Sequence, residues 1–326
     1  MAAVEESELC FPHLLNASCI KPRQSHFDNP MVPILLYSLM LLTMALNLLV
    51  IISISHFKQL HTPTNLLILS LAFSDFFVGI IACSHIQMSN NCWVFSDIIC
   101  LLDSWLSLTI TSCSIGNIVL ISVDRYVAIC DPLHYTNKIT VRGVQICTSL
   151  CWLLSFLYNS LIMWDNFSLP NGFIPCIGSC VLFLNSIIGL IDFVVSFSGP
   201  VTVIIVLYMR VFVVAVSHAR AMRSHVMQRR TEMVLVKKSE LKAAKTLGVV
   251  VVVFLLCLFP SYGFNFSQQG GAANISKVSF EIWLFFFNSC VNPLIYAFYY
   301  PWFMKSVKII VTFKVFKPDS CEARLL

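Results

Sequence analysis

The stretch MVPILLYSLMLLTMALNLLVIISIS, residues 31–55, decides the fold class, because it contains no charged side chain. A helix needs about 20 consecutive apolar residues to cross the hydrocarbon core of a bilayer. Residues 1–30 lack a basic region followed by an apolar core, so they are not a cleaved signal peptide. We therefore expect the first membrane-spanning helix at residues 31–55.

Six further apolar stretches of similar length follow along the 326 residues. The chain is 58% hydrophobic and 11% charged, whereas about 25% of the residues in a soluble domain are charged. The expected spans are 31–55, 64–87, 97–129, 143–163, 184–217, 241–264 and 279–300. This pattern predicts an all-α membrane protein, a bundle of seven transmembrane helices. Its parts are a tail at 1–30, the bundle at 31–300, and an amphipathic helix with a terminal tail at 301–326.

The distribution of Lys and Arg orients the bundle. Lys21, Arg23 and Lys277 fall on the side of the amino terminus, and the other eighteen of the 21 basic residues fall at or near the opposite face. Because basic residues favour the cytosolic side, we expect the amino terminus outside the cell and the carboxyl terminus in the cytosol. The sequons at Asn16, Asn166 and Asn274 all fall outside in this orientation, so they are candidate glycosylation sites.

Six of the fourteen cysteines are expected in the oxidising compartment outside the membrane, where disulfides form. They are Cys10, Cys19, Cys92, Cys100, Cys176 and Cys180. Six cysteines allow fifteen pairings, and their spacing does not choose among them.

Several functional classes lack their usual sequence features in this chain. There is no Gly-rich phosphate loop, no paired CxxC metal cluster, and no basic, aromatic surface that suggests nucleic acid. No internal repeat is visible, which argues against a transporter built from inverted halves. A channel or transporter would also need several charges along a path, and only Asp75 and Asp192 lie deep in the expected spans.

Asp192 interrupts the fifth apolar stretch, SIIGLIDFVVSFSGP (186–200), and no Lys, Arg or His lies within seven residues of it. A charged group at membrane depth is costly, and it is a functional hypothesis by default. The local sequence leaves two interpretations open. Asp192 is either an ionised carboxylate that binds a cationic ligand or a protonated group hydrogen-bonded to a neighbouring helix.

The third span ends in SVDRYVAICDPLHY (122–135), with the triplet Asp124, Arg125 and Tyr126 at the membrane boundary. Other spans carry characteristic residues in a fixed order, and these are Asn47, Asp75, Trp152, Pro200 and the NPLIY segment at 292–296. Seven spans with these residues resemble a rhodopsin-class G-protein-coupled receptor over nearly the whole chain. A retinal pigment would need a Lys in the seventh span, and residues 279–300 contain none.

The seventh span is similar to one family within that class. NSCVNPLIYAFYYPWF (288–303) matches the signature of trace amine-associated receptors at eight positions, and the segments 61–75 and 124–135 also resemble that family. The resemblance implies a receptor rather than an enzyme. It implies a plasma-membrane protein that senses small amines in olfaction and signals through a stimulatory G protein that raises cyclic AMP.

Two positions depart from the family pattern. Ser107 stands seven residues after Cys100, where an Asp usually holds the ammonium of the ligand, and Leu258 replaces the usual Trp two residues before Pro260. Some fish members of the family resemble this arrangement, with the acid on the fifth helix. The resemblance therefore implies that Asp192 binds the ammonium, with Asp103 as a rival or a second site. The expected ligand-binding residues are Asp192, Asp103, Ser107, Thr111, Phe193, Ser196, Leu258, Tyr262, Trp283 and Phe286.

The resemblance also implies three other sets of residues. It pairs Cys100 with Cys180, Cys10 with Cys176, and Cys19 with Cys92. It places a sodium ion, and no other cofactor, among Asp75, Ser114, Asn288, Ser289 and Asn292. It assigns activation and G-protein coupling to Asp124, Arg125, Tyr126, Glu240, Tyr208, Asn292, Pro293 and Tyr296, with Glu240 pairing with Arg125.

One alternative remains open from the sequence. The chain could be a rhodopsin-class receptor for a ligand that is not an amine, in which Asp192 has only a structural role. The expected partners are otherwise the ligand, the G protein and membrane lipid, with no nucleic acid.

Overall fold

The computed structural model describes residues 9–14, 17–20, 31–90, 92–168, 176–180, 186–224, 248–249, 252–253, 255–257, 284, 286–296, 300–317 and 320–325. Within these residues, five helical segments are long and apolar enough to cross a membrane. They are α1 (Met31–His56), α2 (Pro63–Asn90), α3 (Asp97–Cys130), α5 (Val141–Ile162), and a rod made of α7 (Ser186–Asp192), a π-helical turn η4 (Phe193–Ser198) and α8 (Gly199–Ser224). The described part of the expected seventh span, 286–296, is helical, and most of the expected sixth span lies outside the described residues.

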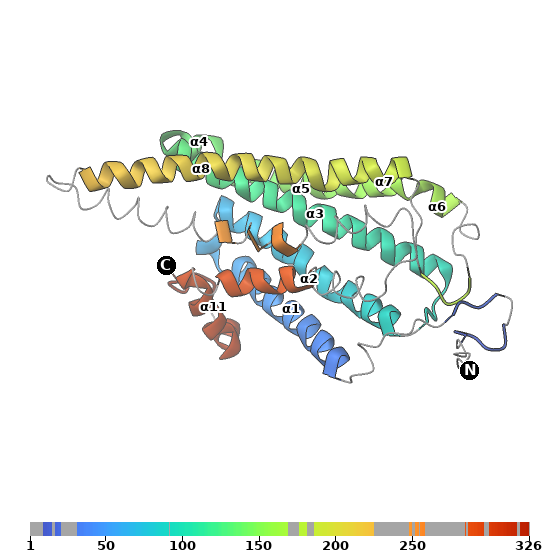
Figure 1. The fold of residues 1–326 in the computed structure, drawn as a ribbon. Coiled ribbons are helices and arrows are strands. Elements are labelled where there is room, and N and C mark those ends of the chain that lie inside the picture. Colours follow the sequence, from blue (N-terminus) through green and yellow to red (C-terminus); the bar gives the residue numbers. More distant parts are fainter. Residues whose placement is uncertain are drawn as a thin grey trace, which may run out of the picture.

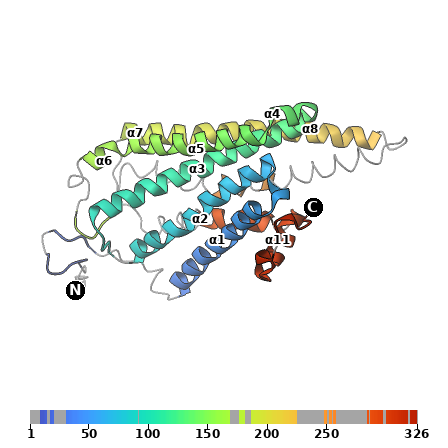
Figure 2. The same cartoon turned by 180° about the vertical axis from the view of Figure 1, so that it is seen from behind.

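The third helix occupies the middle of this arrangement (Figures 1 and 2). Helix α3 packs against α2, α5 and α8, while α1 covers α2. The described tail residues 9–20 and residues 320–325 lie at opposite ends of the helices (Figure 1).

The side chains of α5 show why this bundle belongs in a membrane. Leu153, Leu154 and Leu157 are exposed on the outside of the bundle, whereas the polar Ser155 and Asn159 are buried against other helices. Lipid tails are as apolar as Leu, so the apolar face needs no protein cover, while polar groups find hydrogen-bond partners between helices.

The fifth span is broken in its middle by the π-helical turn Phe193–Ser198. Pro200 has no backbone N–H and its ring clashes with the carbonyl one turn earlier, so the regular ladder cannot continue through it. The Gly199 N–H instead reaches five residues back to the Val194 carbonyl. Such bulges re-aim the side chains around them, and this one begins directly after Asp192.

Short helices connect the spans at both ends of the bundle. They are η1 (Lys58–Leu60), η2 (Pro132–His134), α4 (Tyr135–Lys138) and α6 (Trp164–Ser168). After the seventh span come α11 (Pro301–Val311), η5 (Lys314–Phe316) and η6 (Ser320–Glu322). The tail then folds back on the loop after α1, where Glu322 forms an ion pair with Lys58 at 3.2 Å and Leu325 is 1% exposed.

Candidate functional site

Asp192 lies at the end of α7, and its carboxylate is partly buried. Two hydroxyl groups donate to the same carboxylate oxygen, Oδ1. Ser196 Oγ lies 2.7 Å from it and Tyr158 OH lies 3.2 Å from it. Because Tyr158 belongs to α5, the carboxylate is held between the fourth and fifth spans. The structure therefore places the deep acid of the fifth span in a polar setting built by two helices.

Tyr158, which holds the Asp192 carboxylate, was not among the residues expected at this site. A buried Tyr usually needs a partner for its hydroxyl, so a Tyr within an apolar span was the available signal. That signal could not name Asp192 as the partner, because the rotation of α5 about its own axis decides where the hydroxyl points.

The wall formed by α3 carries the other expected polar residues. Thr111 Oγ1 donates to the Ser107 carbonyl at 2.8 Å, and both side chains are partly buried. Asp103, one turn outward, accepts a hydrogen bond from Ser84 Oγ of α2 at 2.7 Å. The two acids are thus oriented by different helices, Asp192 by α5 and Asp103 by α2.

The expected aromatic residues do not share one environment. Phe193 follows Asp192 directly and its ring lies 5.7 Å from that of Phe197. Phe286 is 4% exposed and packs in an apolar cluster with residues of α1, α2 and α3, such as Leu36 and Val78. The expected ligand residues Leu258, Tyr262 and Trp283 lie outside the described residues.

The disulfides among the described residues differ from two of the three expected pairs. The structure joins Cys100 to Cys180, the pair that the resemblance implied. It joins Cys10 to Cys92 and Cys19 to Cys176, so the pairings Cys10–Cys176 and Cys19–Cys92 are wrong.

Backbone pairing explains the exchange. The tail pairs with the loop before α7, because Cys19 N donates to the Ile177 carbonyl at 2.9 Å and Ile177 N donates to the Ala17 carbonyl at 2.7 Å. This pairing brings Cys19 beside Cys176. Trp93 N donates to the Gly178 carbonyl at 3.0 Å, which brings Cys92 to the position where Cys10 lies. A Cβ at Gly178, whose φ is +105°, would stand 2.7 Å from Cys10 Cβ.

One of the three candidate glycosylation sites is buried. Asn166 in α6 is 3% exposed, and its Nδ2 faces the sulfur of Met163 at 4.0 Å. A glycan has no room at a side chain enclosed in this way, so the expectation for Asn166 is wrong. Asn16 and Asn274 lie outside the described residues.

A polar cluster occupies the middle of the bundle around Asp75, which is completely buried. Asn292 Nδ2 donates to Asp75 Oδ2 at 2.8 Å, and the Ser289 hydroxyl also bonds to this carboxylate. Among the residues described, four buried oxygens of this cluster have no hydrogen-bond partner. They are Asp75 Oδ1, Ser114 Oγ, Asn288 Oδ1 and Asn292 Oδ1. Unsatisfied buried oxygens of this number call for a bound group, because each costs free energy when left alone.

The carboxyl-terminal end of α3 is held by a network centred on the Asp124–Arg125 ion pair. Thr64 Oγ1 of α2 donates to Asp124 Oδ2 at 3.0 Å and accepts from Arg125 Nη2 at 2.5 Å, and Tyr135 OH donates to Asp124 Oδ1 at 2.8 Å. The third residue of the triplet, Tyr126, packs against the cluster of Ile129 and Val211, where α3 meets α8. Glu240, the expected partner of Arg125, lies outside the described residues.

Two expected switch tyrosines converge on one apolar cluster. Tyr296 of the seventh span is 1% exposed, and Tyr208 of α8 packs against the same cluster. Pro293 lies between Asn292 and Tyr296 and is buried as well. Tyr208 and Tyr300 also interact electrostatically with Arg125, so the ends of the third, fifth and seventh spans meet near that residue.

Beyond the carboxyl-terminal end of α3, a short loop carries its own ion pairs. Asp131 accepts hydrogen bonds from Lys138 Nζ at 2.8 Å and from His134 Nδ1 at 2.7 Å. Lys138 and then His134 lower the pKa of Asp131 below its usual value, since both stabilise the ionised carboxylate.

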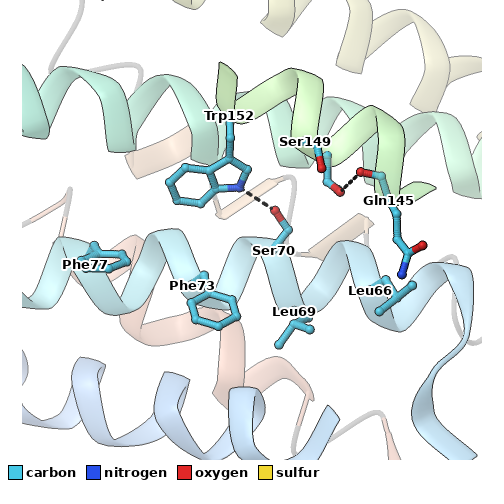
Figure 3. A pocket seen from close by; sticks show the side chains of 9 residues that line it. Leu66, Leu69, Ser70, Phe73, Phe77, Gln145, Ser149 and Trp152 are labelled. Carbon is cyan, nitrogen blue, oxygen red and sulfur yellow. Dashed lines mark hydrogen bonds between the residues drawn. The ribbon is translucent and has the colours of Figure 1, made fainter. Parts of the chain in front are cut away.

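A cavity of about 590 Å³ lies between α2 and α5 (Figure 3). Trp152 Nε1 donates to Ser70 Oγ at 3.0 Å on its inner wall, and the exposed rings of Phe73 and Phe77 line its apolar part. Its lining contains no acidic residue, so it offers no partner for an ammonium group.

Comparison with known proteins places these features in a family. The model of the 7 transmembrane receptor (rhodopsin family) matches residues 46–296. Trace amine-associated receptor 13c of Danio rerio is 35% identical, covering 98% of this chain and 97% of its own length. Trace amine-associated receptor 8a of Rattus norvegicus is 38% identical, with 98% and 96% coverage. Trace amine-associated receptor 1 of Macaca mulatta is 34% identical, with 96% and 97% coverage.

Proposed function

The chain belongs to the trace amine-associated receptors of the rhodopsin family, and on that premise we propose that it is a receptor for small amines that activates a stimulatory G protein. A member of this family is a multi-pass membrane receptor and not an enzyme. The proposal includes a place at the plasma membrane with the amino terminus outside, a rise in cyclic AMP on activation, and a role in olfaction.

The observation that carries the amine assignment is the Asp192 carboxylate. An alkylammonium has a pKa near 10 and is charged at pH 7, so it supplies the counter-charge that an acid at this depth needs. Two hydroxyl groups stabilise one oxygen of the carboxylate, which offsets part of the cost of holding a charge there. Neither hydroxyl carries a positive charge, so the demand for a cation remains.

Asp103 is the second acid that an amine can reach. Its position on α3, one turn outward from Ser107, gives a diamine a second carboxylate. We assign it to the distal ammonium of a diamine and not to a monoamine, because Ser84 orients it from α2, away from the helix that holds Asp192.

The mid-membrane cluster fits a sodium ion. Asp75, Ser114, Asn288 and Asn292 present oxygen atoms without partners among the described residues, and hard cations prefer oxygen ligands. The ion would supply a positive charge beside Asp75. Asn292 and Ser289 orient that carboxylate from the seventh span, so the cluster ties this span to α2.

The proposed change between the inactive and active states depends on Arg125. In the structure its guanidinium is bound to Asp124 and Thr64, which keeps it at the cytosolic end of α3. We assign Glu240 as a further partner that restrains the sixth helix. An amine shifts the equilibrium between the inactive and active states only by its differential affinity for them.

A dose–response panel tests the function. Cells that express the full chain receive primary, tertiary and diamines, each matched with a neutral alcohol of the same skeleton, and cyclic AMP is measured. We expect responses to amines and none to alcohols, with Asp192→Asn losing the amine response and Asp103→Asn weakening only diamines. Responses to alcohols that survive Asp192→Asn would instead favour a receptor for a non-amine ligand, in which the bonds to Tyr158 and Ser196 give Asp192 a structural role.

A further inference from the structure

Residues 320–325, which we call the carboxyl-terminal segment, are bound to the loop after α1. Four polar contacts join the segment to this loop. They are His56 Nε2 with Ser320 Oγ at 2.9 Å, Lys58 Nζ with Glu322 Oε1 at 3.2 Å, Gln59 Nε2 with the Glu322 carbonyl at 3.4 Å, and Leu325 N with Gln59 Oε1 at 3.2 Å. The Gln59 amide therefore holds two backbone groups of the segment at once, while the other two contacts recognise side chains.

Leu325 anchors the segment in the core of the bundle. Its side chain is buried in an apolar cluster at the end of α1 and in η1, which includes Phe57. Ala323 packs against the same cluster, whereas Glu322 and Arg324 are exposed. Alternate residues of the segment thus face the bundle and the solvent, as in an extended chain laid on a surface.

Local structure turns the chain back toward α1. After α11, Phe313 has a φ of +54°, a left-handed conformation that commonly ends a helix. Ser320 Oγ donates to the Val315 carbonyl at 2.6 Å, which ties η6 to η5. The start of the return is fixed as well, because the hydroxyls of Ser306 in α11 and Ser53 in α1 lie 2.8 Å apart.

The apolar cluster that takes up Leu325 also contains Tyr296 of the seventh span, and Tyr208 of α8 packs against it. These are the two tyrosines expected to take part in activation. We propose that the carboxyl-terminal segment is an autoinhibitory strap. Bound to the loop after α1, it stabilises the arrangement in which Arg125 is bound to Asp124, and its release favours the active state. The inference goes beyond the proposed function, because it does not depend on which ligand binds.

The physical basis is linkage through one packed cluster. A close-packed cluster has few discrete arrangements, so Tyr296 and Tyr208 cannot turn without displacing their neighbours. Leu325 is enclosed by members of the same cluster, so its binding favours the arrangement in which they stay in place. By reciprocity, a change of that arrangement weakens the binding of the segment by the same factor.

The binding of the segment is weak enough to be reversed. It buries one large apolar side chain, and full burial of a Leu shifts an equilibrium by about ten- to a hundredfold. The entropy lost when residues 320–325 become ordered opposes this gain. Lys58 and Glu322 are 67% and 66% exposed, so their ion pair adds little. The bound and released states are thus close in free energy, as a switch requires.

The test breaks the contact from both sides in the full chain. Leu325→Ala removes the buried side chain, and Arg324→Ala is its matched control, because Arg324 is the preceding residue and is exposed. Lys58→Glu and Glu322→Lys each break the ion pair, and the double variant restores it with the charges exchanged.

Two measurements are made on each purified receptor. Binding of the segment is followed by hydrogen exchange of the Leu325 amide, which donates to Gln59. Signalling is followed without any amine, as guanine-nucleotide exchange per receptor on purified G proteins of the stimulatory and inhibitory classes. The second measurement therefore depends neither on Asp192 nor on a rise in cyclic AMP.

We expect Leu325→Ala to speed exchange of its own amide at least tenfold. Nucleotide exchange should rise by about two- to tenfold, because only the part of the binding free energy that differs between the two states reaches the signal. Lys58→Glu and Glu322→Lys should each raise it by less than about fivefold, the limit for an exposed ion pair. The double variant should return to the level of the parent, and Arg324→Ala should match the parent in both measurements.

Two results would overturn the inference. If Leu325→Ala frees the amide while nucleotide exchange per receptor stays at the level of the parent, the segment is only a structural anchor. If the Leu325 amide of the parent exchanges as fast as that of an unstructured peptide, the strap does not form. In both cases the proposed amine site stands, and a failed amine panel would leave the strap intact. Where Leu325→Ala does not fold, the charge exchange decides, and a double variant no closer to the parent than the single ones would contradict the strap.

Discussion

The negative charge of the proposed amine site can be moved from one helix to another. Asp192→Asn keeps the shape of the side chain and its place at the start of the π-helical turn, but removes the charge. Adding Ser107→Asp puts a carboxylate back on α3, which packs against the same rod. The Thr111 hydroxyl donates to the Ser107 carbonyl, so the backbone that would carry the new carboxylate is held in place.

The size of the effect follows from the charge. An ammonium and a carboxylate about 4 Å apart attract by roughly 4 kcal/mol at an effective dielectric constant near 20. If desolvation cancels half of this, about 2 kcal/mol remains, and 1.4 kcal/mol corresponds to a factor of ten in affinity. Asp192→Asn should therefore weaken every amine response at least tenfold. The double variant should recover part of it for some amines, with a changed rank order, because the ligand then lies the other way round.

The assay is a cyclic AMP dose response at matched surface expression, with Ser107→Asn in the Asp192→Asn background as the uncharged control. If that control restores the response as well as Ser107→Asp does, the recovery does not depend on a negative charge at position 107. If Asp192→Asn alone responds like the parent, the amine binds elsewhere, and Asp103 is the first residue to test.

Three other predictions concern regions away from the proposed amine site. Since Cys10 is bonded to Cys92, changing either to Ser should lower surface expression equally and the double change should cost no more; additive losses would contradict this pair. Thr64→Val removes the hydroxyl of α2 that bonds to the Asp–Arg pair of α3, and its hydrogen bonds contribute about 1 kcal/mol. Ligand-free signalling should therefore rise up to about fivefold. An unchanged baseline would show that Thr64 does not restrain the pair. The lowered pKa of Asp131 means that its ion pair with Lys138 stabilises α4 above the ordinary Asp range and that this contribution is lost as the pH falls toward the lowered value. Amide exchange in α4 should then rise in acid, and Asp131→Asn should remove that pH dependence.

The sequence alone determined the spans and the depth of the acid. A helix satisfies its own backbone hydrogen bonds, so in a bilayer the length of an apolar run is enough to define a spanning element. The described helices begin and end close to the expected limits for this reason, and the expected end at residue 217 differs because α8 continues to Ser224 beyond the apolar run. The sequence also showed that Asp192 has no basic residue nearby in the chain, because this depends only on its sequence neighbours.

The tertiary structure decided which groups meet. The pairing of Cys10 with Cys92 follows from the register between the tail and the loop before α7, and a shift of register would give another pairing. Asn166 lies in a sequon but is buried, because the side of α6 that faces the protein is set by packing. Phe286 belongs to the core beside α1 and α2 for the same reason.

The contact between Tyr158 and Asp192 shows the limit most directly. The two residues are 34 positions apart, and the rotations of two separate helices must agree within the length of one hydrogen bond before they meet. Hydropathy places each residue at a depth in the membrane. It says little about the azimuth, the rotation of a helix about its own axis, when the outer face of that helix meets lipid. That azimuth is fixed by close packing between helices, so only the folded bundle joins the phenol to the carboxylate.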